Sequence, residues 1–200
     1  MNNNLKKIFD NIYLKQIWKH EESVSGPGSE LRATIILRKK IIPEIIDITK
    51  AKSFLDIPCG DFNYMKEVNF NCEYTGADIC DKIIKNNTKK YPNAKFICLD
   101  LTSDTIPKSD IVFTRDCLVH LSLEDCLKAI DNIVSSGSKY LAITSFPNCN
   151  FNEELPNFSW RWRTLNMEIE PFNFKRMAIF NEGFLKDKYK DKSVLLTRIN

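Results

Sequence analysis

Four aspartates each follow a short apolar run, a pattern that would place them together in one ligand site. They are Asp56, Asp78, Asp100 and Asp116. If these runs are neighbouring parallel strands, the acids meet at the carboxyl edge of a sheet, where open α/β sheets bind ligands. Each charge-assisted hydrogen bond to a carboxylate contributes about 1.5–3 kcal/mol. One acid alone could cap a helix or solvate a turn, but the series of four favours a binding site.

The first aspartate begins a tight turn, residues 56–61, with the sequence Asp-Ile-Pro-Cys-Gly-Asp. Gly60 can provide a positive φ or a close backbone approach to a ligand. The turn lacks the Gly-x-Gly-x-x-Gly spacing of dinucleotide sites. Asp78 lies 22 residues after Asp56, the distance expected for a carboxylate that binds both ribose hydroxyls. These features favour an adenosine ligand without a pyrophosphate, such as S-adenosylmethionine.

The apolar periodicity predicts the elements that position these acids. Strands are expected at 52–57, 73–78, 94–98, 110–114 and 139–144, and helices at 5–20, 30–42, 43–48, 62–68, 81–90 and 123–134. A final strand pair is expected at 176–180 and 193–199. Alternating strands and helices predict an α/β, Rossmann-like doubly wound sheet. We expect it to be mostly parallel, with an antiparallel C-terminal strand pair and helices on both faces.

The chain is expected to form one domain over residues 1–200, because it has no internal repeat and no long linker. Residues 1–49 should form N-terminal helices and a Ser-Gly-Pro-Gly-Ser lid over cofactor or substrate. Residues 50–146 should form the cofactor-binding core. Residues 147–200 should supply a substrate insert and the terminal strands.

Composition excludes several classes of protein. The net charge of +3 and the 28% of charged residues show no basic stripe for nucleic acid. No apolar run approaches the ~20 residues of a membrane span, and no signal peptide is visible, which predicts a cytoplasmic protein. The seven cysteines include no Cys-x-x-Cys pair. We expect reduced thiols in the core and no metal site; a zinc site or a nucleophilic cysteine is the alternative.

Over roughly residues 50–146 the chain resembles class I S-adenosylmethionine-dependent methyltransferases. The resemblance rests on the segments Leu-Asp-Ile-Pro-Cys-Gly at 55–60, Tyr-Thr-Gly-Ala-Asp-Ile at 74–79, Leu-Asp-Leu at 99–101, and the stretch 110–121. It implies S-adenosyl-L-methionine as cofactor and S-adenosyl-L-homocysteine as product. The family's first turn usually has glycines at the positions of Pro58, Gly60 and Phe62, and only Gly60 is present here.

The resemblance also implies which residues contact the cofactor. The first turn should meet its methionine part, the acid after the second strand its ribose, and the acid after the third strand its adenine. The expected cofactor residues are Trp18, Gly26, Ser29, Asp56, Pro58, Gly60, Asp78, Ile79, Asp100, Leu101, Asp116 and Cys117. The flanks of the core resemble those of small bacterial methyltransferases, some of which are associated with surface-polysaccharide biosynthesis.

His120 is the candidate catalytic base, because it lies four residues after Asp116, where the acceptor is expected. A structural histidine at a helix start is the alternative, and His20, next to two glutamates, is expected in solvent. The expected substrate residues are Arg115, Arg161, Arg163 and Asn166. The alternating Trp and Arg residues at 160–163 fit a clamp for an anionic or sugar-like acceptor, or simple surface cation–π pairs.

These features predict O-methylation of a small or carbohydrate-linked acceptor, with or without a phosphate group. No nucleic-acid partner is expected, and the oligomeric state stays open. A non-catalytic methyltransferase-like binding subunit is the alternative, motivated by the missing glycines. A nicotinamide-dependent reductase is disfavoured by the same turn and by the strand-rich C-terminus.

Overall fold

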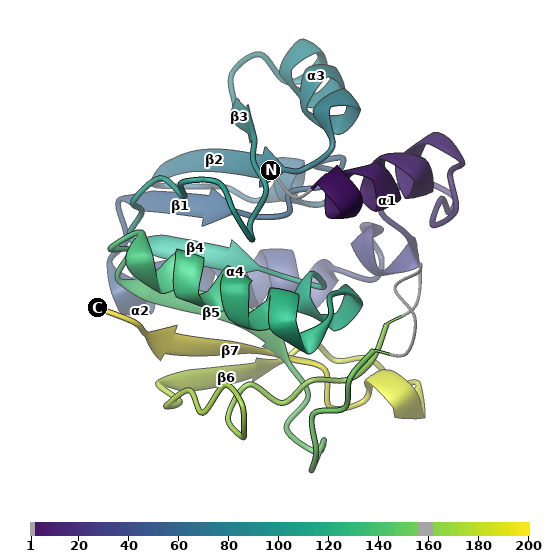
Figure 1. The fold of residues 1–200 in the computed structure, drawn as a ribbon. Helices are drawn as coiled ribbons and strands as arrows, with labels where there is room; N and C mark the ends of the chain where they lie inside the picture. The colour runs from purple at the N-terminus through teal and green to yellow at the C-terminus, as the bar shows by residue number, and fades with distance from the viewer. Residues whose placement is uncertain (1–2, 156–161) are drawn as a thin grey trace.

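A seven-stranded sheet forms the centre of this computed structural model, which describes residues 3–155 and 162–200. The strand order is β3-β2-β1-β4-β5-β7-β6 (Figure 1). The strands are β1 (Ser53–Asp56), β2 (Glu73–Asp78), β3 (Lys95–Cys98), β4 (Ile111–Thr114), β5 (Tyr140–Ser145), β6 (Ala178–Asn181) and β7 (Ser193–Arg198). The first five strands pair in parallel, whereas β7 is antiparallel to β5 and β6. The predicted fold class is confirmed.

Helices cover both faces of the sheet, so the central strands must be apolar on both sides. In β1, Phe54 faces the layer that contains α2 (Ile42–Thr49), and Leu55 faces the layer that contains α4 (Leu123–Ser135). Both side chains are buried. Figure 1 shows α4 in front of the sheet and α2 behind it. The period of two along each strand thus divides the core into two layers.

Three expected helices differ from the structure. The first, α1 (Asn3–Leu14), ends before residue 20, and Gln16 just beyond it has a left-handed φ of 52°. The second becomes a π-helical turn, Leu37–Ile41, that continues into α2. The third, expected at 62–68, is only a 3-10 turn, Met65–Glu67, because Phe62 has a φ of 59° and cannot belong to a helix. By contrast, α3 (Asp81–Lys90) and α4 match their expected bounds closely.

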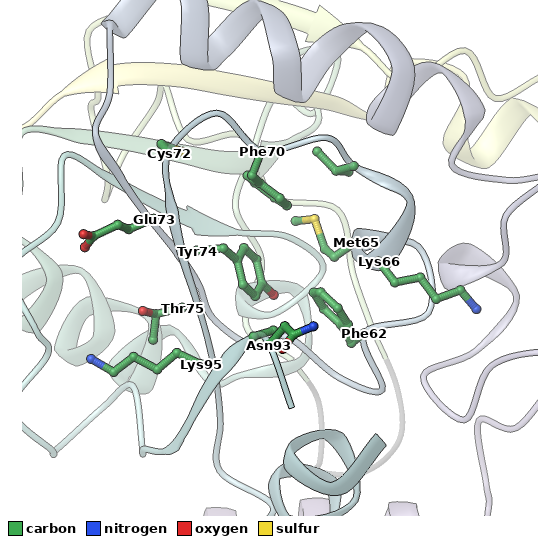
Figure 2. A pocket seen from close by; sticks show the side chains of 12 residues that line it. Phe62, Met65, Lys66, Phe70, Cys72, Glu73, Tyr74, Thr75, Asn93 and Lys95 are labelled. Atoms are coloured by element: carbon green, nitrogen blue, oxygen red, sulfur yellow. The ribbon is translucent and has the colours of Figure 1, made fainter. Parts of the chain in front are cut away.

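An aromatic cluster stands where the helix at 62–68 was expected. The ring of Tyr74 lies 5.1 Å from that of Phe62 and 4.8 Å from that of Phe70, between ring centroids (Figure 2). A pocket of about 510 Å³ lies beside this cluster, next to residues 73–75 and 93–95. These residues begin β2 and β3, whereas parallel sheets bind ligands where strands end. The pocket in Figure 2 is therefore not the site that the aspartates predict.

Two further features concern the whole chain. All seven cysteines are free thiols. None of the helices in the described ranges combines the length and the apolar character needed to cross a bilayer.

The cap of α4 provides a test of the helix assignment. Ser122 accepts a hydrogen bond from the backbone N–H of Asp125 at 3.0 Å. We expect Ser122→Ala to lower the free energy of unfolding by about 1 kcal/mol in urea titration. Ser135→Ala, at the exposed end of the same helix, should change it by less than about 0.5 kcal/mol. Equal losses in the two variants would show that the cap does not stabilise α4.

Candidate functional site

A cavity of about 1190 Å³ opens at the carboxyl ends of β1, β2, β3 and β4. The arrowheads of the parallel strands point toward α1 and the 3-10 turn Asp187–Tyr189, which border this side of the sheet (Figure 1). Ligand pockets usually measure about 300–1,000 Å³. This cavity therefore has room for a cofactor and a second small molecule.

The acid that ends β2 is held in place from both sides. The backbone N–H of Gly60 donates to Asp78 Oδ2 at 3.1 Å, and the N–H of Cys80 donates to Asp78 Oδ1 at 2.9 Å. Burial raises the pKa of Asp78 to about 6, although the two N–H groups oppose this shift. Each carboxylate oxygen retains a lone pair for a further donor. Asp78 and Ile79 both line the cavity.

The acid after β3 lies in a similar arrangement. Asp100 Oδ1 accepts hydrogen bonds from the backbone N–H of Thr102 at 2.9 Å and from its hydroxyl at 2.7 Å. Asp100 and Leu101 line the cavity, together with Ile79 from the neighbouring strand end. Two fixed carboxylates beside apolar side chains fit an adenosine, which presents hydroxyl and amino donors around a flat ring.

The turn after β1 allows a close backbone approach. Gly60 has a φ of 52°, and a Cβ at this position would lie 2.4 Å from Ser25 Oγ. A residue with a side chain would therefore collide with the segment that covers the turn. Pro58 and Gly60 line the cavity, as predicted. At Phe62, where the family usually has its third glycine, the backbone still has the left-handed φ of 59°.

Residues 22–29, which we call the lid, bind this turn directly. The carboxylate of Asp61 accepts hydrogen bonds from the Ser23 hydroxyl at 3.1 Å and from the Val24 N–H at 2.8 Å. The side-chain amide of Asn63 donates to the carbonyl of Ser29 at 3.1 Å. Gly26 and Ser29 of the lid line the cavity. The structure thus places the lid against the expected methionine end of the site.

Asp116 belongs to a buried ion-pair network rather than standing alone. Its carboxylate pairs with Lys192 and, at 3.3 Å, with Arg115. Arg115 also donates to Glu182 at 2.7 Å and to the carbonyl of Gly28 in the lid at 3.1 Å. Burial alone would raise the pKa of Asp116, but the two cations outweigh it and hold the pKa far below its usual range. Arg115, expected to bind substrate, is thereby engaged within the protein.

Asp56 does not line the cavity. It is 1% exposed and accepts a hydrogen bond from the Tyr74 hydroxyl at 2.7 Å. Its other oxygen, Oδ1, has no hydrogen-bond partner among the described residues. Burial raises its pKa to about 8, so the folded protein holds Asp56 as a neutral acid near pH 7.

The side chains of His120 and Trp18 lie next to each other. Their ring centroids are 4.6 Å apart, with an angle of 34° between the planes. Both residues line the cavity, and so does Cys117, whose thiol pKa is raised by burial. His20 is about half-exposed and hydrogen-bonds Glu30. The structure thus brings the candidate base into the same space as the strand-end acids.

Two of the other expected substrate residues, Arg163 and Asn166, are not brought to the cavity. Arg163 donates to the backbone carbonyls of Glu153 at 2.7 Å and Val119 at 3.2 Å. The side-chain amide of Asn166 donates to the carbonyls of Pro147 and Cys149. Both residues fix loop backbone and neither lines the cavity. Arg161 lies outside the described residues.

Sequence reasoning missed one wall of the cavity, the connection between β6 and β7. It contributes Glu182, Phe184, Lys186, Lys188, Tyr189 and Lys192. The segment is rich in charged residues, as solvated turns are, so its composition does not indicate a binding site. Two aromatic residues, Phe184 and Tyr189, lie among these lysines. They could have identified the segment as part of a binding site, because exposed turns rarely need aromatic side chains.

The buried state of Asp56 gives a pH-dependent prediction. Its pKa is about 8 in the fold against an ordinary 3.8, so between these values the folded state binds a proton that the unfolded chain releases. Stability should therefore fall as pH rises through this window. Asp56→Asn removes this dependence, so its stability relative to wild type should increase from about pH 5 to about pH 8 in urea unfolding.

Asp110→Asn is the matched control. The hydrogen bond from Lys139 lowers the pKa of Asp110, so its charge stabilises the fold, and the amide should cost stability at neutral pH. A relative stability of Asp56→Asn that stays constant with pH would show that Asp56 is ionised in the fold.

Comparisons with known proteins agree with this geometry. Residues 55–142 match a family model described as a methyltransferase domain. No protein of curated function matches the chain. The fold is similar to that of the N-methyltransferase NodS from Bradyrhizobium japonicum WM9 in complex with S-adenosyl-L-homocysteine. The TM-score is 0.67 and the identity 12%, over 94% of this chain and 98% of that one.

Two further solved structures share the fold. Magnesium protoporphyrin IX methyltransferase from Synechocystis PCC 6803 has a TM-score of 0.65 and 13% identity, over 98% of this chain and 95% of that one. Human N-acetylserotonin methyltransferase has a TM-score of 0.64 and 13% identity, over 96% and 59%. These likenesses establish the fold, and the family match favours a methyltransferase over a reductase. Residues 55–142 thus match a methyltransferase domain, and the fold of the chain is that of methyltransferases of known structure.

Proposed function

We propose that this enzyme transfers a methyl group to an oxygen atom of a small or carbohydrate-linked acceptor. One observation carries the proposal: the same cavity is lined by Asp78 and Asp100 and also by His120. The acids suit the cofactor, and the imidazole suits an acceptor that must lose a proton. The structures with a similar fold include an enzyme named an N-methyltransferase, so the argument for oxygen rests on His120 and not on the fold.

Asp78 and Asp100 are the residues that would hold the nucleoside. Asp78 would accept hydrogen bonds from the ribose hydroxyls, and Asp100 would accept from the adenine amino group. The turn around Gly60 and the lid would enclose the methionine part, because Gly60, Gly26 and Ser29 line that end of the cavity. S-Adenosylmethionine, when bound, supplies a methyl group on a positively charged sulfur.

His120 would act as general base on the acceptor. His120 would take the hydroxyl proton as the acceptor oxygen attacks the methyl group. The cofactor, when bound, would supply that methyl group and would retain the electron pair of its broken carbon–sulfur bond. The protein's main contribution is alignment of the reacting atoms. Trp18 packs against the imidazole and fixes its plane.

The setting of this reaction follows from the flanks of the domain. They resemble those of small bacterial methyltransferases associated with surface polysaccharides, so we place the reaction in the cytoplasm, on a precursor of such a polymer. Loss of one O-methyl sugar from the cell-surface polysaccharide of a deletion strain would support this assignment.

Asp78 provides a direct test of the cofactor site. We expect Asp78→Ala to weaken binding of S-adenosylhomocysteine by about 1.5–3 kcal/mol, measured by calorimetric titration. Asp131→Ala, on the exposed side of α4, is the control and should bind the ligand like wild type. Wild-type protein that gives no heat with millimolar ligand would refute the cofactor site. Unchanged affinity in Asp78→Ala would remove only Asp78 from it.

His120 is tested by separating turnover from binding. We expect His120→Ala to lower kcat by about 10²–10⁴-fold, the usual contribution of a general base. Its affinity for S-adenosylhomocysteine should stay within about twofold, because Asp78 and Asp100 are intact. Normal turnover would dismiss His120 as the base. Cofactor binding by wild type without turnover on any acceptor would instead favour a non-catalytic binding subunit.

A further inference from the structure

The cavity has an aromatic wall formed by four side chains. The ring of Trp162 stacks between those of Phe146 and Tyr189, with centroid distances of 6.1 Å and 5.1 Å and an angle of 26° in both pairs. Phe184 adds a fourth ring, 5.9 Å from Tyr189. All four residues line the cavity. Such a wall offers a large apolar surface to a ring-shaped ligand.

Positive charge lies along the same wall. The amine of Lys188 lies 4.8 Å from the ring centroid of Tyr189 and 5.6 Å from that of Trp162. Lys186 lines the cavity two residues earlier. In the described part of the chain, neither lysine forms an ion pair with a carboxylate. Both side chains can therefore bind an external anion.

Two acids that line the same cavity are already neutralised. Glu182 and Asp116 pair with Arg115 and Lys192, two carboxylates with two cations. The buried network is therefore close to neutral overall. Lys186 and Lys188, which line the cavity and are exposed, add positive charge beside this network. An anionic acceptor is favoured there, and a cationic one is disfavoured.

We propose that the acceptor is an anionic sugar, whose phosphate or carboxylate binds Lys186 and Lys188 while its ring packs against Tyr189 of this aromatic wall. This inference rests on the proposed function and names the substrate class for the same site. The C–H face of a sugar ring is apolar and suits an aromatic wall. The lysines, as flexible point charges, suit either anionic group.

The test uses the full chain saturated with S-adenosylhomocysteine. Calorimetric titrations with glucose 1-phosphate, galactose 1-phosphate, glucuronate, glucose and inorganic phosphate separate the ring from the charge. We expect at least one anionic sugar to bind more tightly than both glucose and inorganic phosphate. Comparison of the sugar phosphates with glucuronate then shows whether the site binds a phosphate or a carboxylate group.

Two matched pairs of variants assign the contacts. Lys188→Ala should weaken binding of the anionic sugar by about tenfold, whereas Lys190→Ala should not. Lys190 belongs to the same connection but does not line the cavity. Tyr189→Leu should weaken binding, and Tyr189→Phe, which keeps the ring, should preserve it.

Three results would overturn the inference. They are equal binding of glucose and the anionic sugars, binding of inorganic phosphate alone, and no effect of Lys188→Ala. Failure to bind any anionic sugar would also overturn it. The protein is first titrated with S-adenosylhomocysteine. If the proposed function is wrong, this first ligand does not bind, and that result is distinct from a failure to bind the sugars.

Discussion

The ion pair between Arg115 and Glu182 is the interaction on which the cavity depends. Both side chains are almost fully buried, and they join the end of β4 to the end of β6. The same guanidinium holds the lid through the carbonyl of Gly28 and lies beside Asp116. Removing one partner of a buried pair costs about 3–5 kcal/mol, because the other charge stays behind unpaired. One arginine therefore connects the end of β4 to the lid and to the end of β6.

Around this pair, the site is built mainly from backbone held by carboxylates. Asp78 fixes the turn at Gly60, and Asp61 fixes the lid at Val24. Each acid satisfies N–H groups that would otherwise be left without partners near an apolar cavity. The residues of the site lie on loops, and the sheet holds these loops in position, as is usual in α/β proteins.

The sequence predicted the parts of the fold that follow from local pattern. Buried strands such as β1 and β4 are short apolar runs, and α4 has a visible cap at Ser122, so both were found. The strand-end acids Asp78 and Asp100 were found because parallel strands end at one edge. The pairing of Arg115 with Glu182 spans 67 residues, and nothing in the local pattern indicates it. Arg115 lines the cavity, and its expected contact with substrate stays a prediction.

The turn at Phe62 shows which property of the chain a glycine motif reflects. Its backbone has the left-handed conformation that glycine usually supplies at the matching position of the family's turn, and its ring packs into the aromatic cluster around Tyr74. A left-handed φ costs a residue with a side chain about 1–2 kcal/mol, and buried aromatic contacts can offset such a cost. What this turn retains is a backbone shape and not a residue type. A search that requires three glycines would miss this turn, although its path keeps the left-handed φ at Phe62.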